Sequence, residues 1–226
     1  MDDYPRALGW APGPVDERDH ALSSFLPRPA LEGEKAWGWG EMPDLNQLRE
    51  GACTSFAIGN SVNCEPRRQG MDSDFCFEAY HSTTEHDEFP DDWSSGQTGT
   101  SLRSAMKEWR GRGVINSYAF SYSVEEVVSW VLTTGPVCIG VEWWTGMDDP
   151  ANENDWFIEP TGSVRGRHAI CVPRVHWGMG GENWVGVLNS WGRKNWGNNG
   201  RARLSEASFR ILLERDWNAT AIAAVD

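Results

Sequence analysis

The spacing of apolar residues changes near the middle of the chain, and this change constrains the fold more than any other feature. Before residue 135, apolar side chains recur every three or four residues, as on one face of a helix. After Gly135-Pro136 they alternate, as in half-buried strands. Helices in the first half and strands in the second predict an α+β protein with two lobes, and sites commonly form in the cleft between lobes.

Four segments of the first half have helical spacing. They begin at Cys53, span about 73–82 with Ser73 as N-cap, run from about Thr100 to Arg110, and follow a capping box of Ser123 and Glu126. The fourth is the clearest, because its apolar stripe ends at Gly135-Pro136. Residues 83–99 between the second and third form an acidic loop.

The second half is predicted to contain mostly strands. Val137, Ile139, Val141 and Trp143 alternate, and a loop is expected over 145–166. Further strands are expected at 168–175, 183–189, 200–204 and 219–224, with a helix at about 206–214. Residues 1–45 are rich in Pro and Gly and predict an irregular arm that wraps the domain formed by residues 46–226.

Composition excludes several function classes. The net charge of −13 argues against a nucleic-acid partner, which needs a basic surface. The five cysteines are sparse, odd in number and not at metal-finger spacing, so we expect no metal, no cofactor and a reducing compartment. No signal peptide and no apolar run of the ~20 residues that span a membrane is visible, which predicts a cytoplasmic protein without membrane insertion.

The stretch from Gln47 to Ala57 carries the first chemical signal. Cys53 follows two small residues, Gly51 and Ala52, and stands where a helix begins. A lone cysteine is more often a small buried hydrophobe than a nucleophile. A nucleophilic cysteine needs a base and a group that orients the base, so the rest of the chain has to supply them.

Candidates for both partners lie in the second half. His168 begins an apolar strand directly after a Gly-rich loop, where a side chain can face a cleft. Asn189 ends a later strand just before Trp191, and an amide there can orient an imidazole while the indole shields their hydrogen bond. Each residue alone is also compatible with a structural role.

The order of these blocks resembles the papain family of cysteine peptidases, and is more similar to its bacterial and phage branches than to the secreted plant and animal enzymes. Five stretches carry the resemblance, which spans roughly residues 42 to 224: Asn46-Gln47 through Gly51-Ala52-Cys53, Gly99 to Arg103, His168-Ala169-Ile170, Asn189-Ser190-Trp191-Gly192, and Trp196 to Gly200. The fold it implies has a helical N-terminal lobe bearing the nucleophile, an antiparallel barrel-like C-terminal lobe, and the active site between them.

The resemblance implies an endopeptidase with a Cys53-His168-Asn189 triad that works through an acyl-enzyme thioester on protein or peptide substrates. Gln47 would donate to the oxyanion, and Trp191 would cover the His168–Asn189 bond. A helix N-terminus and a neighbouring imidazolium should lower the pKa of Cys53, giving a thiolate–imidazolium pair at rest.

Substrate contacts are expected from Gly51, Ala52 and Trp191, and from three further residues. Trp143 and Trp144 lie where family members line a substrate pocket, although one of them should pack in the core because neighbours on a strand point opposite ways. Arg167 precedes the base and would either disfavour the imidazolium or bind an acidic substrate group.

Several features depart from the secreted members of the family. Thr54 replaces a tryptophan, and Glu50 replaces a half-cystine, so that disulfide cannot form. We expect no long inhibitory pro-domain before the catalytic region, and we hypothesise that residues 20–45 partly line or block the cleft. Two rival functions stay open: a cell-wall peptide endopeptidase, and a phage protein that keeps the fold and is assembled into a larger complex or virion.

Overall fold

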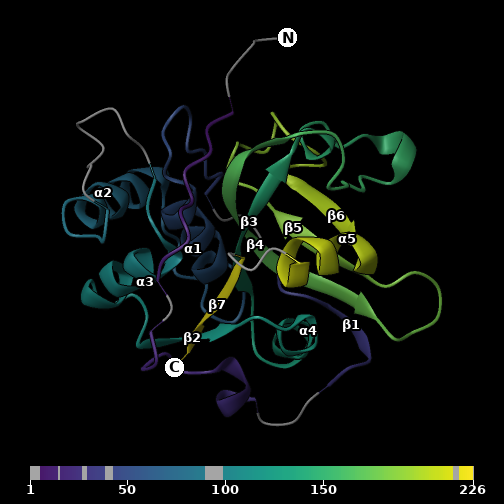
Figure 1. Ribbon diagram of the computed structural model, residues 1–226, viewed down its shortest axis with the longest axis horizontal. Helices are drawn as coiled ribbons and strands as arrows, with labels where there is room; N and C mark the ends of the chain where they lie inside the picture. The colour runs from purple at the N-terminus through teal and green to yellow at the C-terminus, as the bar shows by residue number, and fades with distance from the viewer. Residues whose placement is uncertain are drawn as a thin grey trace.

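The computed structural model describes residues 6–14, 16–26, 30–38, 43–89, 99–215 and 219–225. In Figure 1, α1, α2 and α3 gather on one side of the molecule and strands β3 to β6 on the other. This is the expected α+β arrangement in two lobes. None of the described helices has the length and apolar character needed to cross a membrane.

One antiparallel sheet of seven strands organises the described part of the C-terminal lobe, in the order β2-β7-β3-β4-β5-β6, with β1 also paired to β4. The strands are β1 (Gly33–Ala36), β2 (Ser117–Ser121), β3 (Val137–Trp144), β4 (Val164–Trp177), β5 (Trp184–Leu188), β6 (Arg201–Ser205) and β7 (Thr220–Val225). The long β4 pairs with β3, β5 and β1, so its residues lie at the centre of the lobe.

The helices begin close to their predicted positions. They are α1 (Cys53–Asn63), α2 (Ser73–Thr84), α3 (Leu102–Gly111), α4 (Val124–Thr133) and α5 (Glu206–Arg210), which continues as a wider turn over Ile211–Arg215. Ser73 is wrong as the N-cap of α2: Asp72 is the cap, and its carboxylate accepts from the Phe75 N–H. Both residue types cap helices, so the sequence alone did not separate them.

The predicted capping box at α4 forms with an additional member. The Ser123 hydroxyl accepts from the Glu126 N–H, as expected. The Glu126 carboxylate does not reach back to the Ser123 N–H; it accepts from the Ser121 hydroxyl, whose oxygen accepts from that N–H. The serine ending β2 thus completes the cap and fixes the connection between β2 and α4.

Three strands extend beyond the sequence prediction. β1 lies inside the arm and joins the sheet by pairing with β4. One face of this strand is half-buried and the other is exposed, so its four residues lack an apolar alternation. β2 was not predicted. β4 begins at Val164, within the segment expected to be loop, because its first residues are exposed and follow a Gly-rich turn.

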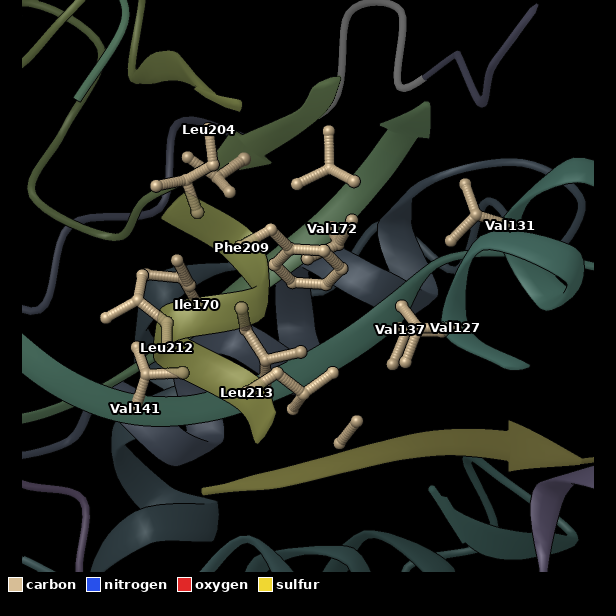
Figure 2. Packing of buried hydrophobic residues seen from close by; sticks show 14 of the residues in the cluster. Val127, Val131, Val137, Val141, Ile170, Val172, Leu204, Phe209, Leu212 and Leu213 are labelled. Carbon is tan, nitrogen blue, oxygen red and sulfur yellow. The ribbon is translucent and has the colours of Figure 1, made fainter. Parts of the chain in front are cut away.

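The two larger of the three buried clusters among the described residues fill the two lobes. One is built around α1, α2 and α3. The other lies between the sheet, α4 and α5, and Figure 2 shows Phe209 and Leu213 facing the valines of β3 and α4. Every residue of α1 is buried, because this helix packs between the other helices and strand β4. The start of α1 therefore lies where the lobes meet.

Candidate active site

Cys53 is the first residue of α1, and its thiol lies against strand β4 of the other lobe. The Ala169 N–H of β4 points to its sulfur at 3.4 Å. Gly51 and Ala52 directly before it are buried, and Cys53 itself is fully buried. Helix α1 and strand β4 thus bring the predicted nucleophile next to the residue that follows the predicted base.

His168 and Asn189 meet as the sequence suggested. His168 lies on β4, Asn189 follows β5, and His168 Nε2 is 2.8 Å from Asn189 Oδ1. That oxygen also accepts the Ser190 N–H at 2.7 Å, which fixes the orientation of the amide. An amide oxygen only accepts, so Nε2 carries the hydrogen, and Nδ1 is the ring nitrogen left for a proton from Cys53. Nδ1 has no hydrogen-bond partner within the described residues.

Tryptophans enclose the imidazole. Trp191 stacks on His168 with ring centroids 4.9 Å apart, and Trp143 meets it edge to face at the same distance. Trp196 packs behind both indoles. The indoles shield the His168–Asn189 hydrogen bond, and a hydrogen bond shielded from water is electrostatically stronger.

Gln47 lies on the other side of the site. Its side-chain oxygen accepts from the Ser190 hydroxyl, which sets the amide orientation and leaves the NH₂ group as the donor end. That group donates to the Glu50 carbonyl at 2.8 Å and to the Ala7 carbonyl at 3.2 Å. The Trp191 indole donates to the same Ala7 carbonyl at 3.1 Å. Gln47 therefore points a donor at a peptide carbonyl of the N-terminal arm.

The arm segment formed by residues 7–11 covers the site. Gly9 and Trp10 donate their N–H groups to the Arg167 carbonyl, at 3.2 and 3.3 Å. On the other lobe, Thr100 donates to the Gly9 carbonyl at 2.9 Å and accepts from Ala11 at 3.0 Å, which makes a short parallel bridge. Figure 1 shows this part of the chain running beside α1. Backbone pairing with both lobes holds residues 7–11 in the cleft.

The fit of this segment is tight. A Cβ on Gly9 would lie 1.9 Å from the Gly51 carbonyl oxygen, so only glycine can approach the chain next to Cys53 this closely. The Trp10 ring lies over Gly140 of β3, where a Cβ would come within 2.2 Å of it. Trp10 is 4% exposed although it belongs to an arm. The sequence hypothesis placed residues 20–45 at the cleft and did not include residues 7–11, which are the described part of the arm that pairs with both lobes here.

Burial of the site in this conformation works against the resting ion pair expected from the sequence. Burial raises the pKa of the Cys53 thiol to about 12, although hydrogen bonds from Ala169 and Gly9 act against this. Burial also lowers the pKa of His168 to about 4, and the Arg165 charge adds to the effect while the Asn189 hydrogen bond opposes it. Thiol and imidazole are therefore both neutral near pH 7, because the arm keeps water away from them.

The predicted pocket residues occupy different places. Trp143 is fully buried against His168 and donates from its indole to Asp148 at 2.9 Å. Trp144 is half-buried and packs against the C-terminal-lobe core. Arg167 contacts the arm through its carbonyl, and the charge that affects His168 belongs to Arg165. Glu50, which replaces the half-cystine, pairs with His81 of α2 at 2.8 Å.

Sequence reasoning missed two sets of residues at the site. The first is the arm segment, in which Gly9-Trp10 between prolines was the only signal. The second is a cluster over Trp191: the guanidinium carbons of Arg6 and Arg165 lie 5.5 and 6.0 Å from its ring centre. Arg165 pairs with Asp148, and Arg6 with Asp149, both at 2.8 Å. These pairings cross long sequence distances and leave no local pattern.

Comparison with known proteins gives a match of folds. No family model and no curated protein matches the chain. Xylellain, a cysteine protease from Xylella fastidiosa, superposes with a TM-score of 0.69 at 15% identity, over 98% of this chain and 97% of its own. A recombinant stem bromelain precursor gives 0.57 at 18% identity over 97% and 77%.

A third solved structure, the digestive procathepsin L 3 of Tenebrio molitor larval midgut, gives a TM-score of 0.53 at 13% identity, over 98% of this chain and 76% of its own. All three likenesses extend over nearly the whole of this chain and include both lobes. The chain therefore has the two-lobe fold of the papain-like cysteine proteases.

Proposed function

We propose that the chain is a cysteine endopeptidase whose nucleophile is Cys53, whose base is His168, and whose orienting residue is Asn189. The observation that carries the proposal is the His168–Asn189 hydrogen bond of 2.8 Å on one lobe, together with the Cys53 thiol at the start of α1, whose sulfur lies 3.4 Å from the N–H of Ala169, the residue after His168. A cysteine that only filled the core would not need an oriented imidazole beside it.

In the reaction, the Cys53 thiol transfers its proton to His168 Nδ1 and the thiolate attacks a peptide carbonyl carbon. The Cys53 N–H and the Gln47 amide donate to the oxyanion that forms. His168 then gives the proton to the departing amine, which breaks the peptide bond and leaves a thioester. Water attacks the thioester with His168 as base, releasing the acid and restoring the thiol.

The described conformation is the latent form of this enzyme. Residues 7–11 occupy the cleft, take the Gln47 donor with the Ala7 carbonyl, and keep Cys53 and His168 neutral. Two of the similar structures described above are also of precursor forms. Displacing the segment would admit water and substrate together, and a hydrated site favours the thiolate–imidazolium pair.

Hydrolysis of a casein-like protein tests the proposal. The Gly9→Leu variant should expel the segment, because leucine cannot occupy the space next to Gly51. We expect Gly9→Leu to cut casein and the double variant with Cys53→Ala to have no activity. Equal activity of the two would contradict the proposal, and activity only on purified cell wall would favour the cell-wall endopeptidase.

A further inference from the structure

The side chain of Arg6, directly before the segment that covers the cleft, is held by a set of groups on the C-terminal lobe. Its guanidinium carbon lies 5.5 Å from the centre of the Trp191 ring. One terminal nitrogen donates to the Asp148 carbonyl. The other donates to the Asn195 carbonyl at 3.3 Å and pairs with the Asp149 carboxylate at 2.8 Å. An aromatic face and three oxygens thus surround this side chain, which is 25% exposed.

These groups match the chemistry of a guanidinium group, whose flat face stacks on an indole while its N–H donors point outward in the plane. Backbone bonds within the lobe fix the oxygens that accept from it. The Asp148 N–H donates to the Thr145 carbonyl at 3.2 Å. The Asn195 N–H donates to the Gly192 carbonyl at 3.2 Å, and its side chain donates to the Trp191 carbonyl at 3.0 Å. The C-terminal lobe therefore forms the site, and the arm supplies only the side chain within it.

The charge of the site favours a cation. Arg165 lies over the same indole, but the Asp148 carboxylate pairs with it at 2.8 Å. Asp149 is then the counter-charge of Arg6. Both aspartates belong to the segment 147–155, which carries four carboxylates and neither lysine nor arginine. When Arg6 leaves, these three charged groups have one more negative than positive charge, which attracts a basic side chain.

The site lies beside the expected position of the reacting carbonyl. The Ala7 carbonyl, next to Arg6 in the chain, accepts from the Gln47 amide that we propose as the oxyanion donor, at 3.2 Å. In the proposed reaction His168 gives its proton to the departing amine. Trp191 stacks on His168 with ring centroids 4.9 Å apart. A substrate side chain over Trp191 therefore belongs to the half that departs as the amine.

We propose that this site, the arginine subsite formed by Trp191, Asp148, Asp149 and Asn195, binds an arginine side chain of the substrate, located shortly after the cleaved bond. In the latent form the arm places Arg6 there, so the chain itself supplies a side chain of the class that the subsite takes. Lysine has the charge without the flat face and binds more weakly. The inference rests on the proposed peptidase function and names the class of substrate that it cleaves.

Cleavage of internally quenched peptides by the Gly9→Leu variant tests the proposal. Arginine is placed at each of the first three positions after the bond or before it, and matched peptides carry citrulline, lysine or glutamate instead. Citrulline has the shape of arginine without its charge. Mass spectrometry locates the cleaved bond. We expect kcat/KM to be roughly tenfold higher for arginine than for citrulline at one position after the bond, with lysine between them and glutamate lowest.

Equal kcat/KM for the arginine and citrulline peptides overturns the proposal, and so does a gain only when arginine precedes the bond. Asp149→Asn should lower the preference for arginine over citrulline about threefold, because it removes the charge that pairs with Arg6. Glu153→Gln, which changes an exposed carboxylate of the same segment, should keep the full preference. Equal preference in the two variants contradicts the role of Asp149. Circular dichroism checks that each variant is folded.

Binding without turnover separates this inference from the proposed function. The double variant of Gly9→Leu and Cys53→Ala keeps the subsite and lacks the nucleophile. Fluorescence anisotropy should show roughly tenfold tighter binding of the labelled arginine peptide than of the citrulline peptide. Arg6→Ala with Cys53→Ala empties the subsite directly and gives the same comparison if Gly9→Leu does not fold. Equal binding overturns the subsite, whereas preferential binding without cleavage of any peptide supports the subsite and contradicts the peptidase function.

Discussion

Two regions of the molecule place arginines against tryptophans, and they differ in what balances the positive charge. In the cleft, Arg6 and Arg165 lie over Trp191, and each has its own aspartate. In the outer pocket, a hollow on the face of β4, β5 and β6 that is lined by Arg174, Arg201 and Arg203, Arg174 pairs with Glu34 and Arg203 makes no ion pair with a described residue. Each arginine of the first region has a carboxylate partner in the chain, whereas Arg203 of the second has none among the described residues.

The two regions also differ in whether a segment of the chain occupies them. The cleft is occupied by residues 7–11, which supply a carbonyl to Gln47 and backbone pairs to both lobes. The outer pocket is kept open by Gly186, and no segment of the described chain fills it. We therefore expect changes in the cleft to alter catalysis and changes in the outer pocket to leave it unaltered.

The largest effect is expected from Gln47→Ala in the Gly9→Leu background. Loss of one oxyanion donor should lower kcat by ~10²–10³-fold, since the donor acts on charge that appears only in the transition state. The measurement is casein or peptide turnover, with Gln69→Ala, an exposed glutamine, as the control. Equal loss in both variants would mean that the amide has no catalytic role.

Gly9→Leu by itself should raise peptidase activity of the full chain at least tenfold. The leucine Cβ would meet the Gly51 carbonyl at 1.9 Å, and each ~1.4 kcal/mol that disfavours the covered state changes its population tenfold. Gly111→Leu is the control, because nothing lies within 4 Å of its Cβ. Unchanged activity of Gly9→Leu would show that residues 7–11 do not limit access.

Acid should destabilise the covered state through His168. Its folded pKa of about 4 lies below the ~6.5 of an unfolded chain, so the unfolded state binds the proton first and the free energy of unfolding falls between about pH 6.5 and pH 4. The loss should be about 1–3 kcal/mol. Denaturant unfolding across this range should show a smaller loss in His168→Gln, whereas His86→Gln, which changes an exposed histidine, should follow the wild type.

The smallest effects are expected on the free energy of unfolding when one arginine of each region is replaced. Arg165→Gln breaks the pair with Asp148 and should lower the free energy of unfolding by about 0.5–1 kcal/mol. Arg203→Gln breaks no ion pair with a described residue and should change it by less than about 0.5 kcal/mol. Chemical denaturation measures both. A larger loss for Arg203→Gln would mean that its stacking on Trp184 is structural and would erase the contrast.

Local patterns predicted the elements of the fold, and the resemblance of the sequence motifs to the papain family predicted the residues of the candidate site. The helix beginning at Cys53, the alternation of β3 and the strand that starts near His168 all follow from side-chain spacing. These elements bring Cys53, His168 and Asn189 to the boundary between the lobes. The reason is that each residue lies at or near the end of an element whose apolar face determines its place.

Contacts that depend on distant parts of the chain were not predictable. These contacts involve irregular backbone or exposed charged side chains, and neither gives a periodic pattern in the sequence. Examples are the close approach of Gly9 to Gly51, the bridge between Trp10 and Thr100, and the pairing of Arg165 with Asp148. For the same reason, the pKa of Cys53 is raised and the pKa of His168 is lowered, which is opposite to the expectation from the sequence. Their burial is caused by residues 7–11, which the sequence did not place in the cleft.

The most direct test of the central claim is stoichiometric labelling by an epoxysuccinyl electrophile, with the modified residue located by mass spectrometry. The account predicts that Cys53 alone among the five cysteines is labelled, slowly in the full chain and at least tenfold faster in Gly9→Leu, with no labelling in Cys53→Ala. Labelling of another cysteine at the same rate, or equal rates at Cys53 with and without the Gly9 substitution, would contradict it.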